Sequence, residues 1–315
     1  MTHLLPTRVW HLTMDAPSAL RPARTPEGVT VARAAVPLGS LNQWLYAEIG
    51  RPHGWVDRAT WTRERWQRHV EGLETWLATV RGTPAGLCEL MRHGDGRVEV
   101  YVFGVLPAVQ GQGAGGALLT AAALRGWELG ATRVTVDTCD LDGPHALANY
   151  RARGFAVVSE SIEPRLRPGS AVASLRDGRP DETAQLEALQ LRASLVWDEY
   201  RAHLEAQPEA VALPAGGQVR VALDRGRRPL GFSVVVPTSD GAWELDGLFV
   251  EPGAQRRGVG RVLVNDLLAR AHAARVGRID VIAGPAREFY EKLGFTVLGE
   301  APTLFGPALA LSRTV

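Results

Sequence analysis

One motif occurs twice in this chain of 315 residues, at a constant spacing. Residues 105–116 read VLPAVQGQGAGG and residues 250–261 read VEPGAQRRGVGR, so both copies contain V-x-P-x-x-Q-x-x-G-x-G. The matched pairs share one offset of 145 residues and are Val105/Val250, Pro107/Pro252, Gln110/Gln255, Gly113/Gly258 and Gly115/Gly260. Two copies at this distance indicate a duplicated domain, because solenoids need more and shorter repeats.

The repeat extends beyond this motif on both sides. Upstream, VEVYVFGV at 98–105 matches WELDGLFV at 243–250. Downstream, ALANYRARGF at 146–155 matches AREFYEKLGF at 286–295. Apolar runs, glycines and helical periodicity then predict the same succession twice: strand, glycine loop, helix, strand, short helix and strand.

The boundary between the halves is predicted at 163–171, where EPRLRPGSA interrupts the periodicity. This gives a domain at 1–165, with an N-terminal strand extension, and a second at 171–315. The first half has helical patterns near 38–48 and 62–73, and the second has one long helical stretch at 180–206. Strand meanders follow in both, so each half is predicted to be a mixed α/β domain.

Composition excludes several classes of function. The formal net charge is +1, which gives no electrostatic reason for a nucleic-acid or acidic-membrane partner. Two cysteines, Cys88 and Cys139, are too few for a disulfide framework or a zinc site, and the scattered histidines suggest no metal. There is no apolar run of about 18 residues and no signal-peptide pattern at the start. A cytoplasmic protein without a membrane anchor is expected.

The glycine loop could hold the phosphate of a dinucleotide. Gly111, Gly113 and Gly116 spell G-x-G-x-x-G, and Asp137 follows about twenty residues on, where a ribose would need an acid. However, the second copy loses that spacing and keeps Q-x-x-G-x-G, and the loop follows several strands rather than the first. A Walker loop is excluded because no Gly-Lys-Ser/Thr follows.

A Q-x-x-G-x-G loop between a strand and a helix is suited to a pyrophosphate. The first N–H groups of the helix have no partner within the helix, and the helix dipole favours an anion there. Glycines allow the backbone to approach the ligand closely. The pattern is weak alone, but here it occurs twice, each time with V-x-P before it and Y-x-x-x-G-F after it.

With these motifs both halves resemble the GCN5-related N-acetyltransferase (GNAT) superfamily, over roughly 28–165 and 171–312. The resemblance implies two acyl-CoA N-acyltransferase domains arranged as an intramolecular pseudo-dimer, acetyl-CoA as donor, an amine acceptor, and a pantetheine arm between two splayed strands. It places the CoA contacts on Val105, Gln110, Gly111, Gln112, Gly113, Ala114, Gly115, Gly116 and Asn149, and on Val250, Gln255, Arg256, Arg257, Gly258, Val259, Gly260 and Arg261.

The resemblance also suggests catalytic residues. Glu99 and Glu244, six residues before the valine of V-x-P, stand where several members have a general base. Asp246 is a second candidate base, at the place where the first half has Tyr101. Tyr150 and Tyr290 would protonate the leaving thiolate or fix the thioester, although both could simply pack against the sheet. Backbone N–H groups near Val105 and Val250 would face the thioester carbonyl.

Acceptor contacts are less well defined. Trp44, Trp55, Trp61 and Trp66 could line an acceptor pocket or pack in the core. Asp140, Asp142 and His145 could contact an amine or form turns and a helix cap. The leading hypothesis is an acetyltransferase acting on a small-molecule amine, with one or both halves active. The alternatives are a non-catalytic acyl-CoA-binding protein and an acyltransferase with a longer acyl donor.

Overall fold

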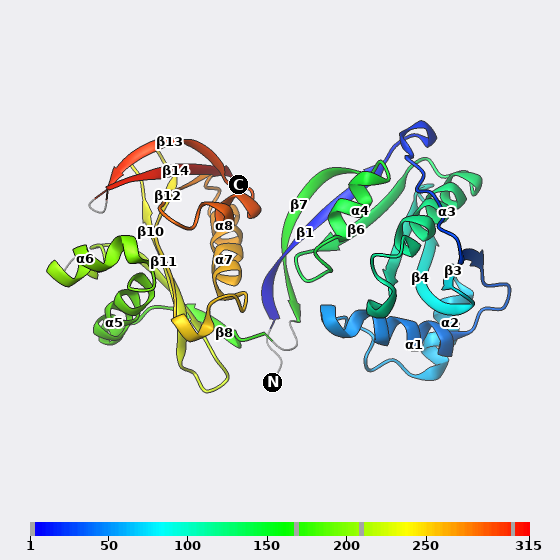
Figure 1. The fold of residues 1–315 in the computed structure, drawn as a ribbon, viewed down its shortest axis with the longest axis horizontal. Helices are drawn as coiled ribbons and strands as arrows, with labels where there is room; N and C mark the ends of the chain where they lie inside the picture. The colour runs from blue at the N-terminus through cyan, green and yellow to red at the C-terminus, as the bar shows by residue number, and fades with distance from the viewer. Residues whose placement is uncertain (1–3, 167–169, 208–210, 304–305) are drawn as a thin grey trace. The chain divides into compact units, whose positions relative to one another are not determined.

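The computed structural model describes residues 4–166, 170–207, 211–303 and 306–315 (Figure 1). The chain separates into two compact units, Arg8–Pro168 and Gly169–Val315, and the second unit also includes the residues up to Thr7. Of the predicted boundary at 163–171, residues 167–169 lie outside the described residues, and the strand before them continues to Leu166. None of the helices in the described ranges is both long enough and apolar enough to cross a membrane.

The unit of Arg8–Pro168 contains a seven-stranded mixed sheet in the order β2-β3-β4-β5-β6-β1-β7. Its strands are β1 (Leu4–Met14), β2 (Val29–Arg33), β3 (Glu74–Val80), β4 (Thr83–Arg92), β5 (Val98–Val105), β6 (Val134–Cys139) and β7 (Ala156–Leu166). Its helices are α1 (Gly39–Gly50), α2 (Arg63–Glu71), α3 (Ala114–Glu128) and α4 (Ala146–Ala152). The helices α1 and α2 confirm the helical patterns near 38–48 and 62–73.

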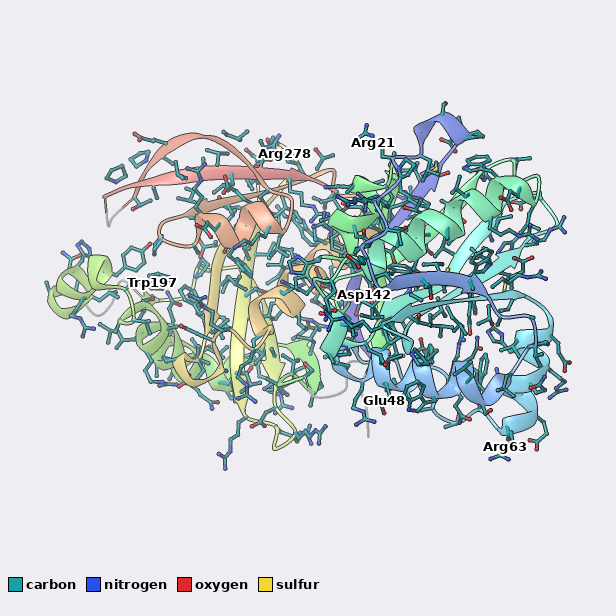
Figure 2. The ribbon with its side chains drawn as sticks, turned by 45° about the vertical axis from the view of Figure 1, so that its right-hand side comes forward. Arg21, Glu48, Arg63, Asp142, Trp197 and Arg278 are labelled. Carbon is teal, nitrogen blue, oxygen red and sulfur yellow. The ribbon has the colours of Figure 1, made fainter. Side chains whose placement is uncertain are left out.

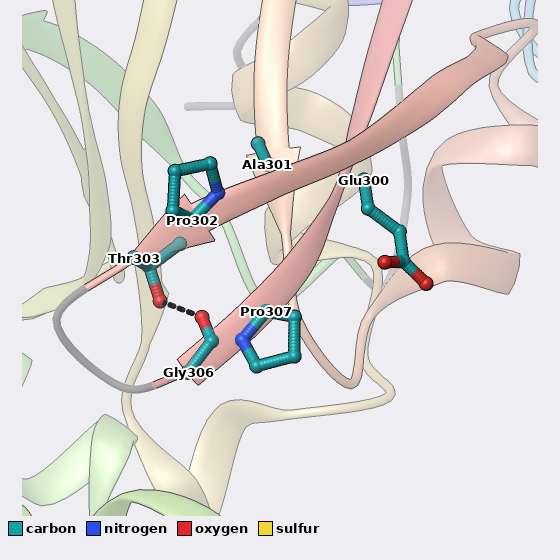
Figure 3. A pocket seen from close by; sticks show the side chains of 6 residues that line it. All are labelled: Glu300, Ala301, Pro302, Thr303, Gly306 and Pro307. Carbon is teal, nitrogen blue, oxygen red and sulfur yellow. Dashed lines mark hydrogen bonds between the residues drawn. The ribbon is translucent and has the colours of Figure 1, made fainter.

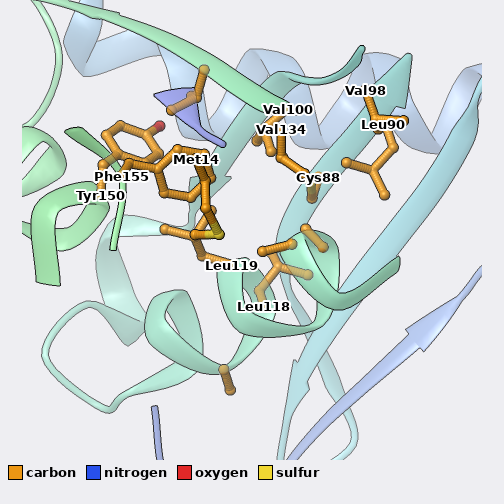
Figure 4. Close-up of a cluster of buried hydrophobic side chains, with 14 of the residues drawn as sticks. Met14, Cys88, Leu90, Val98, Val100, Leu118, Leu119, Val134, Tyr150 and Phe155 are labelled. Carbon is orange, nitrogen blue, oxygen red and sulfur yellow. The ribbon is translucent and has the colours of Figure 1, made fainter. Parts of the chain in front are cut away.

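Both faces of this sheet are covered, and the alternation of side chains along β4 shows why. Cys88 points to a core that it shares with Leu118 and Leu119 of α3 (Figure 4). Its neighbour Leu87 points to the other face and packs with Leu45 of α1. A strand that is buried on both sides reads as a nearly continuous apolar run, as GLCELM does here apart from Glu89.

The second unit contains a sheet of the same kind, in the order β13-β14-β12-β11-β10-β9-β8. Its strands are β8 (Ser174–Asp177), β9 (Gln218–Leu223), β10 (Pro229–Pro237), β11 (Trp243–Val250), β12 (Arg278–Ala283), β13 (Thr296–Thr303) and β14 (Gly306–Thr314). Its helices are α5 (Thr183–Ser194), α6 (Asp198–Ala206), α7 (Val259–Ala273) and α8 (Arg287–Lys292). One core cluster contains residues of α7 and the other contains residues of α5.

The two sheets match strand for strand except in the origin of one strand. In the second unit, the place beside β12 is taken by β14, the last strand of the chain. In the first unit, the corresponding place beside β6 is taken by β1, the first strand of the chain. Both strands run antiparallel to their neighbour, with His11 opposite Asp137 and Ala310 opposite Ile282. The N-terminal extension therefore completes the first sheet.

The start of β1 also contributes to the second unit. Leu5 is 2% exposed and belongs to the same apolar cluster as Val172 and Val259. The side-chain amide of Asn265 donates a hydrogen bond to the Pro6 carbonyl at 3.3 Å.

The prediction of one continuous helix at 180–206 is wrong, because the segment forms two helices. Residues 180–182 form a 3-10 turn, α5 ends at Ser194 and α6 begins at Asp198. The break falls at Leu195–Trp197, where the half-exposed Trp197 is labelled in Figure 2.

Candidate active site

Each sheet opens into a fork between its two central parallel strands. β5 pairs with β6 at Val98–Val134, Glu99–Thr135 and Val100–Val136, and the described pairing ends there. In the second unit β11 pairs with β12 over Trp243–Ile279, Glu244–Asp280 and Leu245–Val281. On its other side, β5 stays paired with β4 as far as Val105. The last residues of β5 and β11 therefore have backbone groups on the fork side that are available to an extended ligand.

A β-bulge lies at the mouth of each fork. Between β4 and β5, Glu89 pairs with Val102 and Leu90 pairs with Val100, so Tyr101 is left without an opposite residue. Between β10 and β11 the same shift leaves out Asp246. A bulge redirects the side chains around it, and both Tyr101 and Asp246 are exposed.

The glycine loop of the first unit enters α3 through two residues in left-handed backbone conformation. Gly111 has φ = 78° and Gly113, which caps α3, has φ = 80°. Gly115 has no such need: a Cβ there would meet nothing nearer than 3.8 Å, with Phe103, Asn149 and Val105 as its neighbours. The protein's own packing does not require glycine at 115, so its absent side chain leaves room above the helix N-terminus.

Other predicted contacts of this loop have structural roles. Ala114 is 1% exposed and anchors the start of α3 in the core, so it offers a ligand only its N–H group. Gly116 accommodates Arg153, whose guanidinium would lie 2.9 Å from an added Cβ. Gln112 donates to the Ala108 carbonyl at 3.5 Å, and Gln110 is exposed at the end of a 3-10 turn.

The corresponding loop of the second unit has the same backbone and a different charge. Arg256 takes the left-handed conformation of Gly111, with φ = 59°, and Gly258 has φ = 81° at the start of α7. Arg256 and Arg257 are exposed and have no acidic partner within the described part of the chain. Arg261 is exposed one turn later. Together they give this loop a positive charge that residues 105–116 of the first loop lack.

The remaining loop residues of the second unit support the turn. Val259 is 1% exposed and fixes the start of α7. The Gln255 side chain donates to the Val250 carbonyl at 3.4 Å. The ring of Phe289 lies 3.2 Å from a Cβ that would be added at Gly260, so this glycine has a packing reason.

Tyr150 and Tyr290 are buried in equivalent places. Tyr150, on α4, lies in the core with Phe155 and is 4% exposed (Figure 4). Tyr290, on α8, is 6% exposed and packs against Phe289 and Phe295. Burial raises the pKa of both phenols, so each keeps its proton at neutral pH. Neither hydroxyl has a hydrogen-bond partner among the described residues.

The candidate bases differ between the units. Glu99 is bonded to His93 at 2.7 Å and accepts a hydrogen bond from Arg97 at 3.2 Å, so two basic groups already hold it. Glu244 has no hydrogen bond to a described side chain. At Asp246 partial desolvation by the sheet raises the pKa of the carboxyl, with no cation to offset the effect. In the part of the chain that the structure describes, Asp246 therefore presents an unpaired carboxylate at the fork, whereas Glu99 is held by His93 and Arg97.

A buried polar cluster, not foreseen from the sequence, lies behind Tyr101 on the α1–α2 face. Glu89 is 0% exposed and is bonded to Asn42 at 2.8 Å, Arg58 at 2.9 Å and His69 at 2.9 Å. Burial alone would raise the pKa of Glu89, but these three partners outweigh it and lower the pKa. The glutamate stands in the apolar run GLCELM, and its partners are 20–47 residues away, so no local pattern marks it.

Aromatic rings enclose the guanidinium of Arg58. The rings of Tyr46, Trp61, Trp66 and Tyr101 have their centroids 4.8–5.3 Å from its central carbon. Trp66 is a core residue at 1% exposure, whereas Trp44 is 47% exposed. The region predicted to line the acceptor side is thus filled, in this unit, by the chain's own cation.

The polar residues after β6 mainly build a turn. Asp142, labelled in Figure 2, accepts hydrogen bonds from the Thr138 hydroxyl at 2.8 Å and the Cys139 N–H at 3.0 Å. Its other oxygen accepts a hydrogen bond from the Trp55 indole at 3.2 Å, which ties the segment after α1 to this turn. His145 stands at the N-cap of α4 without a side-chain capping bond.

A hollow at one end of the β13–β14 hairpin is separate from the forks (Figure 3). There the Thr303 hydroxyl donates to the Gly306 carbonyl at 2.6 Å. Glu300 is the single ionisable group among the six lining residues, which are Glu300, Ala301, Pro302, Thr303, Gly306 and Pro307. We assign it no chemistry.

Comparison with known proteins gives a family match in each unit. Residues 40–155 match the acetyltransferase (GNAT) family model and residues 215–297 match an acetyltransferase (GNAT) domain model. The chain is also 30% identical over 135 residues to the peptidyl-lysine N-acetyltransferase YjaB of Escherichia coli, which covers 41% of this chain and 86% of that protein. The chain belongs to the GNAT family.

Solved structures of GNAT proteins are similar to about half of this chain. An aminoglycoside 6'-N-acetyltransferase in complex with coenzyme A is 22% identical with a TM-score of 0.36, covering 45% of this chain and 96% of that one. A GNAT acetyltransferase from Elizabethkingia anophelis with acetyl-CoA bound is 14% identical with a TM-score of 0.34, covering 45% and 97%. With two family matches and two mixed sheets, this is a tandem GNAT protein, as predicted from the repeat.

Proposed function

We propose that this GNAT protein transfers an acetyl group from acetyl-CoA to a primary amine of a small molecule, and that the second unit carries the reaction. The assignment to the second unit rests on Asp246. This carboxyl lies at the bulge beside the fork, has a raised pKa and has no cationic partner among the described residues. The same unit has the loop with three arginines and a buried, protonated Tyr290.

The residues present suit acyl-CoA. Arg256, Arg257 and the N–H groups at the start of α7 would hold the diphosphate. The unpaired edge of β11 beyond Leu245 would pair with the amide groups of the pantetheine arm. Bound there, acetyl-CoA would supply an acetyl group activated as a thioester.

The second unit then provides the proton transfers. Asp246 accepts a proton from the incoming ammonium, directly or through water, so that the neutral amine can attack. Glu244 lies two residues earlier on β11 and can share this role. The backbone N–H near Val250, at the end of β11, faces the developing oxyanion. Tyr290 holds its proton at the hydroxyl oxygen and gives it to the departing thiolate.

In the first unit the same places are compromised. Tyr101 replaces the free carboxyl, Glu99 is held by His93 and Arg97, and Arg58 occupies the aromatic enclosure. The glycine loop still offers N–H groups and the room above Gly115. We therefore infer that the first unit binds acyl-CoA without rapid transfer, which applies the non-catalytic alternative to this unit. Glu99 and Tyr150 stay candidate catalytic residues until tested.

Calorimetric titration with acetyl-CoA and steady-state transfer to a panel of amines test this proposal together. Two binding sites are expected, with turnover lost in Asp246→Asn and Tyr290→Phe and retained in Glu99→Gln and Tyr150→Phe. Loss of turnover in the second pair alone would assign the reaction to the first unit. Absence of any acetyl-CoA binding would overturn the proposal.

A further inference from the structure

Three polar side chains form a hydrogen-bonded chain across three neighbouring strands of the first sheet. Asp137 on β6 contacts the Nδ1 atom of His11 on β1 at 3.0 Å. The Nε2 atom of His11 contacts the hydroxyl of Ser161 on β7 at 3.0 Å. The order of the strands is β6-β1-β7, so each side chain reaches its immediate neighbour. A carboxylate, an imidazole and a hydroxyl that are hydrogen-bonded in this order are the groups that activate a serine as a nucleophile.

The proton positions follow from the two contacts of the imidazole. Asp137 can only accept, so the Nδ1 atom carries the hydrogen in the neutral ring. The Nε2 lone pair then faces Ser161 and can take its hydroxyl proton. Asp137 and His11 are directly opposite in the strand register, which fixes the ring against the carboxylate.

The Ser161 hydroxyl donates a hydrogen bond to Glu163 at 3.1 Å, so its proton must turn from Glu163 to His11 before it is transferred. That carboxylate already accepts two hydrogen bonds from Arg165, at 2.9 Å and 3.3 Å. Burial would raise the pKa of Glu163, but Arg165 and Ser161 lower it overall, which makes the carboxylate a weak base. His11 is therefore the group that can accept the serine proton.

The position of this chain of residues connects it to the fork. The pairing of β6 with β5 ends at Val136, and Asp137 is the next residue of β6, where the fork begins. The side chains of His11 and Asp137 are 31% and 48% exposed, so a ligand can approach them. In the second unit the opposed residues at the same places are Ala310 and Ile282. The arrangement thus exists only where β1 replaces the closing strand.

We propose that Ser161, His11 and Asp137 form a nucleophilic acyl-transfer site that accepts activated acyl esters or thioesters. The Ser161 oxygen bonds to the acyl carbon while its proton moves to His11. The bond to the leaving oxygen or sulfur then breaks, and His11 returns the proton to that leaving group. Water, or an amine, releases the acyl group from the serine by the same steps in reverse, with His11 again as base and then acid. This activity is independent of Asp246 and Tyr290.

A chromogenic ester tests the proposal without any CoA. The full chain is mixed with p-nitrophenyl acetate, and nitrophenolate release is followed together with the intact mass. We expect a burst of about one equivalent and an acetyl group on the peptide that contains Ser161. The chain has a single lysine, Lys292, so non-specific acetylation of amines is low.

Variants separate this chemistry from a hydrogen-bonded ladder without reactivity. Ser161→Ala should abolish the burst and the adduct, and His11→Gln should slow acylation about 100-fold. The matched control is Ser159→Ala, because this serine on the same strand has no contact with His11 among the described residues. Asp246→Asn and Tyr290→Phe should keep the burst even where amine acetylation is lost. A wild-type chain with neither burst nor serine adduct overturns the proposal, as does an adduct unchanged in Ser161→Ala.

Discussion

Asp246 on β11 and Tyr101 on β5 occupy the same place in their sheets, each as the residue that a bulge leaves without an opposite partner. The backbone at the fork is therefore preserved between the units, while the group presented there changes from a carboxylate to a phenol. The Tyr101 ring contacts the His69 ring and the Arg58 guanidinium. At Asp246 no cation offsets the rise in pKa that desolvation causes. Between the two units the backbone of the fork is kept, and the side chain presented at the bulge differs.

Replacing Asp246 by Asn should greatly lower the rate of amine acetylation and leave the stability of the fold unchanged. We expect kcat for amine acetylation to fall about 100-fold or more, because a general base contributes about that much. The folded chain raises the pKa of Asp246 above its ordinary 3.8, so ionisation of this group costs stability as pH rises. The melting temperature of Asp246→Asn at pH 7 should thus equal or slightly exceed that of the wild type.

The pH dependence of kcat/KM is a second measurement that tests Asp246→Asn. The acidic limb of kcat/KM in the wild type should follow the deprotonation of Asp246 and should be missing from Asp246→Asn. Asp280→Asn is the control, since that carboxylate on β12 pairs with Arg278 and lies outside the bulge. An unchanged acidic limb in Asp246→Asn would point to Glu244 instead.

Two adjacent glycines of α3 should respond in opposite ways to alanine. At Gly115 an added Cβ meets only ordinary contacts, so Gly115→Ala should keep stability or raise it by about 0.5 kcal/mol while weakening acetyl-CoA binding at the first site. At Gly116 the same Cβ would lie 2.9 Å from the end of the flexible Arg153 side chain and 3.0 Å from the Ala23 Cβ, so a loss of up to about 1 kcal/mol is expected, mainly from the shift of Ala23. Thermal unfolding and calorimetry measure both effects. Unchanged affinity in Gly115→Ala would show that no ligand approaches this turn.

The strand, glycine loop and helix beside each fork could be predicted because they repeat, whereas the splayed strands were implied by the family resemblance. The spacing of 145 residues aligns β5 with β11, the two left-handed turns and the bulge positions. These features are local: a strand, a turn that needs positive φ, and a helix start lie within about twenty residues. The short helices that carry Tyr150 and Tyr290 could be predicted for the same reason, since each has its own motif.

The parts that were missed depend on contacts between distant segments. β1 was expected as an extension, but its pairing with β6 joins His11 to a residue 126 positions later. Glu89 reads as an interruption of an apolar strand until Arg58 and His69 fold over it. Sequence periodicity indicates on which face of a strand or helix a residue lies. It does not indicate which distant residue packs against that face.

Arg256 offers a test of how the second loop binds its anion. A non-glycine residue at φ = 59° is strained, and the matched position in the first loop is Gly111. Arg256→Gly should therefore raise the free energy of unfolding by a few tenths of a kcal/mol to about 1 kcal/mol. Acetyl-CoA affinity at the second site should fall about tenfold or more and lose part of its salt dependence. A variant with equal affinity at low salt would contradict a phosphate contact by this side chain.

Glu89 should control the stability of the first unit. Glu89→Gln leaves Arg58 buried at 6% exposure without its carboxylate, which costs about 3 kcal/mol. Seven of the nine tryptophans lie in this unit, so fluorescence during urea unfolding reports mainly on it. Glu48→Gln is the matched control, because the exposed pair with Arg51 contributes well under 1 kcal/mol.

The same carboxylate predicts a pH dependence of unfolding. The partners of Glu89 lower its pKa below the ordinary 4.5, so the unfolded chain binds its proton first as pH falls. The stability that Glu89 contributes is complete above about pH 4.5 and is lost as pH drops through the lower pKa of the folded state. Urea midpoints between pH 6 and pH 3 should decline more steeply for the wild type than for Glu89→Gln. Parallel curves would mean that Glu89 is not ionised in the folded chain.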